Sequence, residues 1–111
     1  MNATPRIRPA VLSLALSFAA AALLFPAAAA AVDAAAAQAL ARQNRCFRCH
    51  SVDKEKTGPA WKDVAAKLKG NKDAEALLMK HLTGKGPDPD HPVAKGSPDA
   101  VKNLADWILS L

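Results

Sequence analysis

The residues with the clearest chemistry are Cys46, Cys49 and His50, which form the pattern Cys-x-x-Cys-His. This pattern is the attachment sequence of a c-type haem. Two thiols add across the two vinyl groups of one porphyrin edge, and the two intervening residues let both sulfurs reach. Because the histidine follows directly, its imidazole can bind the iron from one face of the ring. The motif predicts one haem, covalently bound through Cys46 and Cys49, with His50 as an iron ligand.

Three other roles for the two cysteines fit the sequence less well. A redox dithiol of the thioredoxin kind needs a βαβ context, and no stretch has the alternating pattern of a strand. A structural zinc site needs four ligands, but the remaining histidines, His81 and His91, stand ten positions apart, outside the usual spacing. A disulfide across two residues is short and strained.

The N-terminal segment has the three parts of a secretory signal peptide. Arg6 and Arg8 form a positive start, residues 10–25 an apolar core, and residues 26–31 a run of small residues suited to cleavage. The apolar run is shorter than the ~20 residues of a membrane-spanning helix. We therefore predict that residues 1–31 are a signal peptide cleaved near Ala31. The mature chain is then periplasmic, without stable membrane insertion, and a retained membrane anchor is the alternative.

The mature chain is small and moderately basic. About 80 of the 111 residues remain after cleavage, which is marginal for a self-sufficient hydrophobic core. A buried porphyrin would supply apolar mass, so we expect the apoprotein to fold poorly. The formal net charge falls from +5 to +3 without Arg6 and Arg8, and the lysines are scattered. This pattern gives no indication of nucleic-acid binding and suits transient docking to redox protein partners with an acidic face.

Apolar spacing and capping residues predict an all-α fold of four short helices. Asp33 and Ser97 are suited to begin the first and last helices, and Gly70 and Gly84 to end the second and third. The expected bounds are residues 35–44, 61–69, 73–83 and 98 to near the C-terminus.

The first and last helices are expected to cross. The faces predicted to meet are Ala36, Ala39 and Leu40 on the first and Leu104, Trp107 and Ile108 on the last. The other predicted apolar stripes are Trp61, Val64, Ala65 and Leu68 on the second helix, Ala74, Leu77, Leu78 and Leu82 on the third, and Val101, Leu104, Ala105 and Ile108 on the last.

Three stretches resemble the short soluble class I cytochromes c of bacterial respiratory chains. They are residues 46–50, residues 57–65 (Thr-Gly-Pro-Ala-Trp-Lys-Asp-Val-Ala) and residues 104–110 (Leu-Ala-Asp-Trp-Ile-Leu-Ser). The resemblance implies a small class I cytochrome c fold over residues 32–111, wrapped around one haem c. In such proteins the proline of the Gly-Pro pair accepts a hydrogen bond from the iron-binding histidine. This implies that Pro59 orients His50 and that Trp61 lines the same side of the haem.

The resemblance breaks on the other side of the iron. The family normally places a methionine there, in a Met-Pro pair about sixteen residues before an aromatic residue of the last helix. In this chain the position is His91, sixteen residues before Trp107, in a loop that is shorter than usual. Neutral imidazole is a good haem ligand, so we predict an iron held by His50 and His91. Met79, His81 and an open iron are the alternatives, although core packing for Met79 and a surface position for His81 are their ordinary roles.

An iron with two histidine ligands leaves no place for a substrate. The predicted function is therefore one-electron transfer between redox partners through the exposed haem edge. A gas-binding or sensing haem protein with an open or labile sixth site is the alternative, and a haem subunit of a larger enzyme is a third. No acid, base or nucleophile converges beyond the haem ligands, so we expect no enzyme activity of its own.

Overall fold

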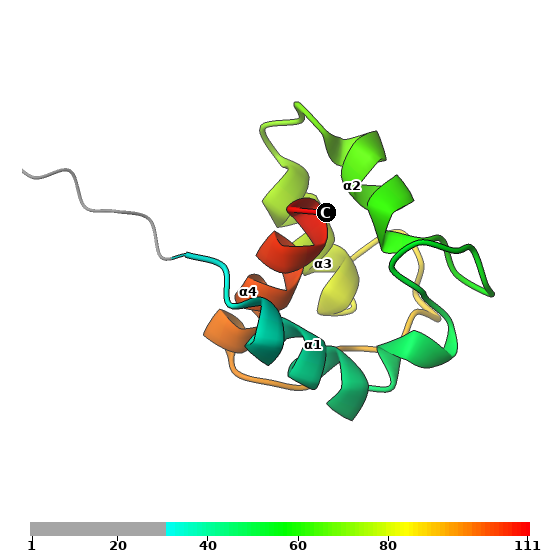
Figure 1. Ribbon diagram of the computed structural model, residues 1–111, viewed down its shortest axis with the longest axis vertical. Helices are drawn as coiled ribbons and strands as arrows, with labels where there is room; N and C mark the ends of the chain where they lie inside the picture. Colours follow the sequence, from blue (N-terminus) through cyan, green and yellow to red (C-terminus); the bar gives the residue numbers. More distant parts are fainter. Residues whose placement is uncertain (1–30) are drawn as a thin grey trace, which may run out of the picture.

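The computed structural model describes residues 31–111, so the predicted signal peptide lies outside the described residues except for Ala31. Within this range the chain forms helices and no strand (Figure 1). The elements are α1 (Ala34–Gln43), the 3-10 helix η1 (Cys46–Arg48), α2 (Trp61–Leu68), α3 (Ala74–Leu82) and α4 (Pro98–Leu109). The prediction of an all-α fold with four short helices is confirmed. No helix of residues 31–111 is long and apolar enough to cross a membrane.

Two helices begin at the side-chain caps that the sequence predicts. The Asp33 carboxylate accepts a hydrogen bond from the Ala36 amide at 2.9 Å at the start of α1. At the start of α4, the Ser97 hydroxyl accepts from the Ala100 amide at 3.2 Å, and Pro98 is the first helical residue. Each bond satisfies an amide that has no partner inside the helix, and the fixed φ of proline is already helical.

Two other helices are followed by glycines in a left-handed conformation. Gly70, just after α2, has φ +78, and Gly84, just after α3, has φ +75. Residues with a Cβ adopt this conformation at a cost, whereas glycine does so readily. The helix ends predicted at these two glycines are confirmed.

Helix α4 lies at the centre of the core, because it packs against α1, α2 and α3. Figure 1 shows α1 and α4 side by side, although they are the first and last helices of the chain. The predicted stripe of α4 is buried, and Trp107, expected at its flank, is only 6% exposed. The buried residues of α4 are Val101, Leu104, Ala105, Trp107 and Ile108.

The predicted contact face of α1 is wrong by about one position. Ala36 is exposed, whereas Ala37 and Ala41 are fully buried. Ala39 and Leu40 are half-buried, and Leu40 packs against the core. The helix is mostly alanine, so its hydrophobic pattern hardly distinguishes one face from the next. Packing against α4 decides the face, because small side chains let the two backbones approach.

The predicted stripe of α3 is also wrong at one residue. Leu78 and Leu82 are buried, each 6% exposed, but Leu77 is 45% exposed. Met79 is half-buried and packs against the core, as in its ordinary role. Three successive apolar residues cannot all face one side of a helix, since each step turns the chain by about a quarter of a turn.

Two asparagine side chains tie together segments that are distant in sequence. Asn44, after α1, donates to the Lys95 carbonyl at 2.9 Å and accepts from the Lys95 amide at 2.7 Å. In α4, Asn103 donates to the Asp33 carbonyl at 2.8 Å and accepts from the Asp33 amide at 2.9 Å. Asn44 thereby holds the far end of the loop between α3 and α4 against the end of α1. Neither pair of hydrogen bonds is predicted by a pattern in the sequence.

Candidate haem-binding site

The motif cysteines lie at the two ends of one tight turn. Helix η1 begins at Cys46, and Cys49 follows its last residue. The Cys46 carbonyl accepts hydrogen bonds from the amides of Cys49, at 3.1 Å, and His50, at 3.0 Å. Cys46 is half-buried and Cys49 is exposed. Burial raises the pKa of the Cys46 thiol. The turn presents two thiols and one imidazole within five consecutive residues.

The His50 ring is fixed by the Gly-Pro pair that follows it in the chain. Its Nδ1 lies 2.7 Å from the Pro59 carbonyl oxygen. Because a carbonyl can only accept, Nδ1 carries the proton, and Nε2 is left free to bind a metal. Gly58 lies against the same ring: a Cβ at this position would stand 2.5 Å from Cε1 of His50. The Gly58 amide also donates to the Cys49 carbonyl at 2.7 Å, which draws the loop onto the motif.

Aromatic side chains connect His50 to the core. The Trp61 ring is stacked beside His50, with centroids 5.6 Å apart and planes inclined by 22°. Trp61 is 4% exposed and also contacts Phe47, at 5.1 Å, and Trp107 of α4, at 5.5 Å. The first residue of α2 therefore joins the motif to the central helix. This wall of rings keeps water from one side of His50.

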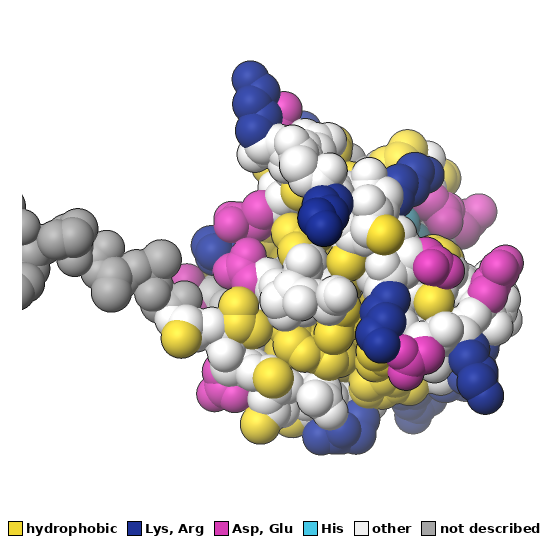
Figure 2. All heavy atoms as spheres, turned by 45° about the horizontal axis from the view of Figure 1, so that its top comes forward, with side chains coloured by type: hydrophobic (Ala, Val, Ile, Leu, Met, Phe, Trp, Pro, Cys, Tyr) yellow, Lys and Arg dark blue, Asp and Glu magenta, His cyan; other side chains and the backbone are white. Residues whose placement is uncertain are grey.

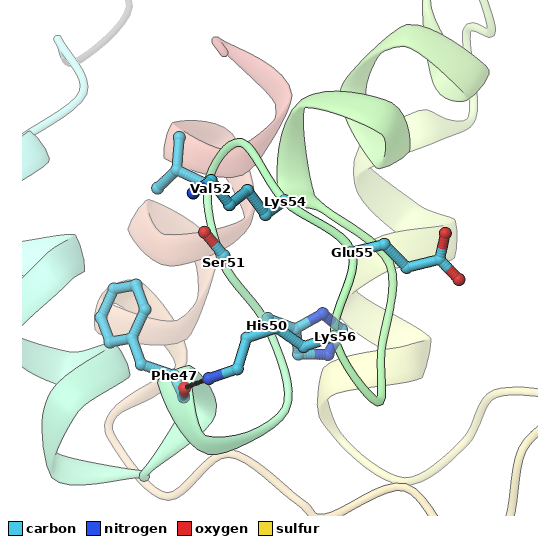
Figure 3. Close-up of a pocket in the computed structure, with 7 residues that line it drawn as sticks. All are labelled: Phe47, His50, Ser51, Val52, Lys54, Glu55 and Lys56. Atoms are coloured by element: carbon cyan, nitrogen blue, oxygen red, sulfur yellow. Dashed lines mark hydrogen bonds between the residues drawn. The ribbon is translucent and has the colours of Figure 1, made fainter.

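A pocket of about 440 Å³ opens beside His50, lined by the loop that leads from the motif to α2. Figure 3 shows this loop curving around the His50 ring. The Lys56 ammonium donates to the Phe47 carbonyl at 2.6 Å, the dashed line in Figure 3. The loop is thus tied back onto the turn that carries the cysteines. The pocket is lined by Phe47, His50, Ser51, Val52, Lys54, Glu55 and Lys56.

His91 approaches His50 from the loop between α3 and α4. The two ring centroids are 6.1 Å apart, and the planes are inclined by 52°. Two imidazoles that each place a nitrogen about 2 Å from one metal ion have ring centroids roughly 6 Å apart. Nδ1 of His91 is buried and has no hydrogen-bond partner among the described residues. The donor set, two thiols and two opposed imidazoles, fits a covalently attached haem.

His81 lies in this site and not on an open surface. It is half-buried in the last turn of α3, and its ring centroid is 3.9 Å from that of His91. Burial lowers the pKa of His81, and the neighbouring His91 adds to the effect, although Asp88 opposes it. The expectation of a surface position was wrong because His81 and His91 sit on different elements, so no helical spacing relates them. Nothing in the sequence pattern marks this contact.

A site for a metal ion alone is not formed. Within residues 31–111 no group of three or more histidines, cysteines or carboxylates is arranged to hold an ion. The zinc alternative for the motif cysteines therefore gains no support.

The chain is similar to known cytochromes c along almost all of the described region. The sequence model of the cytochrome c family matches residues 34–111. Cytochrome c-551 of Pseudomonas aeruginosa is 40% identical over 78 residues, 66% of this chain and 74% of that protein. Cytochrome c-552 of Nitrosomonas europaea is 41% identical over 77 residues, 65% of this chain and 75% of that protein.

Solved structures agree with these sequence matches. The class 1 cytochrome MtoD from Sideroxydans lithotrophicus ES-1 superposes with a TM-score of 0.67 and is 52% identical, covering 72% of this chain and 97% of its own. Wild-type cytochrome c552 of Nitrosomonas europaea superposes with a TM-score of 0.58 at 39% identity, covering 67% and 98%.

The described region is a small all-α haem protein, and the chain belongs to the cytochrome c family. Its fold is that of the class I cytochromes c. Its cofactor is one haem c, attached covalently through Cys46 and Cys49. The predictions of family, fold and cofactor are confirmed, and electron transport is the function of this class of protein.

Proposed function

We propose that this protein is a periplasmic monohaem electron carrier whose iron is held by His50 and His91. The observation that carries the proposal is the approach of these two rings to 6.1 Å from separate segments of the chain. With His50 and His91 both bound to it, the iron would have no free position for a substrate. The haem supplies a one-electron couple, and the remaining role of the protein is to hold it and expose an edge. An electron carrier, and not an enzyme, follows from this arrangement.

The residues around His50 serve to keep the ligand geometry constant. Pro59 holds the proton on Nδ1, so that Nε2 faces the iron. Trp61 packs along the His50 ring and excludes water. A ligand that is positioned before electron transfer does not need to move when the oxidation state changes, which keeps the barrier low.

The location and the partner are inferred from charge and from the N-terminal sequence. Residues 1–31 have the pattern of a secretory signal, and the mature chain carries a formal charge of +3. Figure 2 shows basic side chains spread over the visible face and interleaved with acidic ones. Such a surface suits brief docking to an acidic redox partner.

The bimolecular rate of electron transfer should fall as ionic strength rises, measured by stopped flow with an acidic acceptor protein. A rate independent of salt would contradict an acidic docking face.

The ligand assignment is tested by replacing His91 with methionine. Imidazole is the stronger donor and favours oxidised iron, whereas a thioether favours reduced iron. His91→Met should therefore raise the reduction potential by on the order of 0.1–0.3 V, a fraction of the range that axial ligands span. The oxidised variant should also gain the sulfur-to-iron charge-transfer band, which the unmodified holoprotein should lack.

The matched control is Met79→Leu, which changes a half-buried methionine of α3 and should leave potential and spectrum unchanged. If Met79→Leu removed the sixth ligand, the assignment to His91 would be wrong. If the unmodified holoprotein were already high-spin and bound carbon monoxide fast, gas binding would replace electron transfer as the better proposal.

A further inference from the structure

His81 has no task in the proposed electron carrier, yet its ring touches the distal ligand. The centroids of His81 and His91 are 3.9 Å apart with planes inclined by 44°, which is van der Waals contact. His91 in turn lies 6.1 Å from His50. Three imidazoles therefore form one connected group, although an iron needs two of them.

The backbone of His81 is held firmly by the turn that follows α3. Gly86 packs directly on it: a Cβ at position 86 would stand 2.9 Å from Cα and 3.3 Å from the amide nitrogen of His81. The Lys85 amide donates to the Lys80 carbonyl at 2.8 Å, which closes the turn after α3. A half-buried side chain on such a fixed backbone moves by changing its rotamer, which carries an imidazole over several ångströms.

His91 is held less firmly than His50. Its amide donates to the Asp88 carbonyl at 3.4 Å, a long bond, and its buried Nδ1 has no partner among the described residues. No described side chain or carbonyl therefore fixes the orientation of the His91 ring. The His50 ring, in contrast, has its Nδ1 paired at 2.7 Å. Of the two axial histidines, His91 is the one that leaves more easily.

We propose that His81 is a reserve ligand of the haem iron, which takes the sixth position when His91 leaves it. This inference rests on the proposed ligation by His50 and His91. One iron–nitrogen bond breaks and another forms between neutral imidazoles, with no transfer of an electron or a proton. The His81 ring has to travel about the present separation of the two rings, 3.9 Å, which a rotamer change covers. The reserve ligand keeps the iron low-spin and closed to small gas molecules while the distal loop moves.

The test compares four holoproteins at neutral pH: unmodified, His91→Ala, His81→Ala and the double variant. Electron paramagnetic resonance of the oxidised iron reports the spin state, and stopped flow reports carbon monoxide binding to the reduced iron. His91→Ala should stay low-spin, and the double variant should become high-spin. If His81 occupies nine-tenths of the iron in His91→Ala, carbon monoxide should bind it about tenfold more slowly than it binds the double variant.

Matched controls are the doubles His91→Ala with Lys80→Ala and His91→Ala with Met79→Leu, which alter the neighbours of His81 in α3 and should stay low-spin. A high-spin His91→Ala would overturn the reserve ligand and leave the proposed function intact. A low-spin double variant of His81 and His91 would assign the role to another donor and also overturn it. A high-spin His81→Ala beside an unaltered His91→Ala would instead show that the proposed ligand pair is wrong.

A second measurement does not depend on the folding of the His91 variants. In the otherwise unmodified protein, His81→Ala removes the competitor that captures the iron after His91 leaves. After flash photolysis of the carbon monoxide adduct, internal ligands should recapture the reduced iron in two phases in the unmodified protein, one for each histidine, and in a single phase in His81→Ala. Lys80→Ala is the control and should keep both phases. The same single phase in the unmodified protein and in His81→Ala would overturn the inference.

Discussion

The segment that carries His50 and the loop that carries His91 are built in different ways. The first is hydrogen-bonded within itself and to α2. The Gly58 amide donates to the Cys49 carbonyl at 2.7 Å, and the Trp61 amide donates to the Ser51 carbonyl at 2.9 Å. The second, between α3 and α4, is tied mainly near its ends. Ala94 donates to the Leu82 carbonyl at 2.8 Å, and Lys95 exchanges two bonds with Asn44.

Because of this difference, one segment attaches the haem and a separate, more loosely held loop would supply the second iron ligand. On the side of His50, two covalent bonds and one imidazole come from a five-residue motif, and the following loop locks the ring. On the side of His91, a loop fixed at its ends offers whichever donor stands at one position. The resemblance implies a methionine at this position; if His91 binds the iron as proposed, a histidine takes its place while the four helices form as expected. We therefore expect the distal ligand to be exchangeable without loss of the fold.

The largest expected effect on stability comes from adding a side chain against the His50 ring. Gly58→Ala would place a Cβ 2.5 Å from Cε1 and 2.9 Å from Nδ1 of His50, so the ring or the loop has to move. The cost should be about 1–3 kcal/mol in the free energy of unfolding, typical of an overpacked site. The bond to Pro59 should also be strained, which shifts the haem spectrum. Denaturant unfolding of the holoprotein measures the first effect and optical spectra the second.

Gly96→Ala is the matched change near the end of the distal loop. A Cβ there would stand 3.2 Å from Cδ1 of Leu40, the movable end of a flexible side chain. It should cost less than about 1 kcal/mol and leave the spectrum unchanged. Equal losses in the two variants would contradict the claim that the His50 side is the tighter of the two.

A smaller effect should follow from loosening the distal loop at its anchor. Asn44→Ala removes both bonds to Lys95, which should cost about 1–2 kcal/mol in the free energy of unfolding. If about 1 kcal/mol of this loss falls on the free energy that holds the loop in place, the population without His91 on the iron should rise roughly fivefold. Cyanide binding to the oxidised haem, which requires an open position, should accelerate by a similar factor.

Asn103→Ala is the matched control, since it also removes two bonds to one backbone, that of Asp33 at the start of α1. It should lower the free energy of unfolding by a similar amount and leave cyanide binding unchanged. If both variants opened the iron equally, the effect would reflect general destabilisation and not the anchor of the loop.

Local signals account for what could be predicted. The haem motif, the caps at Asp33 and Ser97, and the glycines after α2 and α3 each act within a few residues. Such features depend on spacing and on backbone preference, which are visible in the sequence. The assignment of His91 as a ligand also came from spacing, relative to Trp107, and it stays a prediction.

The sequence by itself determined the cofactor chemistry and the helices, because both are set by neighbours along the chain. The tertiary structure alone decided which alanines of α1 meet α4, that Asn44 holds Lys95, and that His81 lies against His91. These contacts depend on the path of an irregular loop and on the packing of nearly identical small side chains. Neither the loop path nor this packing produces a periodic pattern in the sequence, since the fold as a whole brings the partners together.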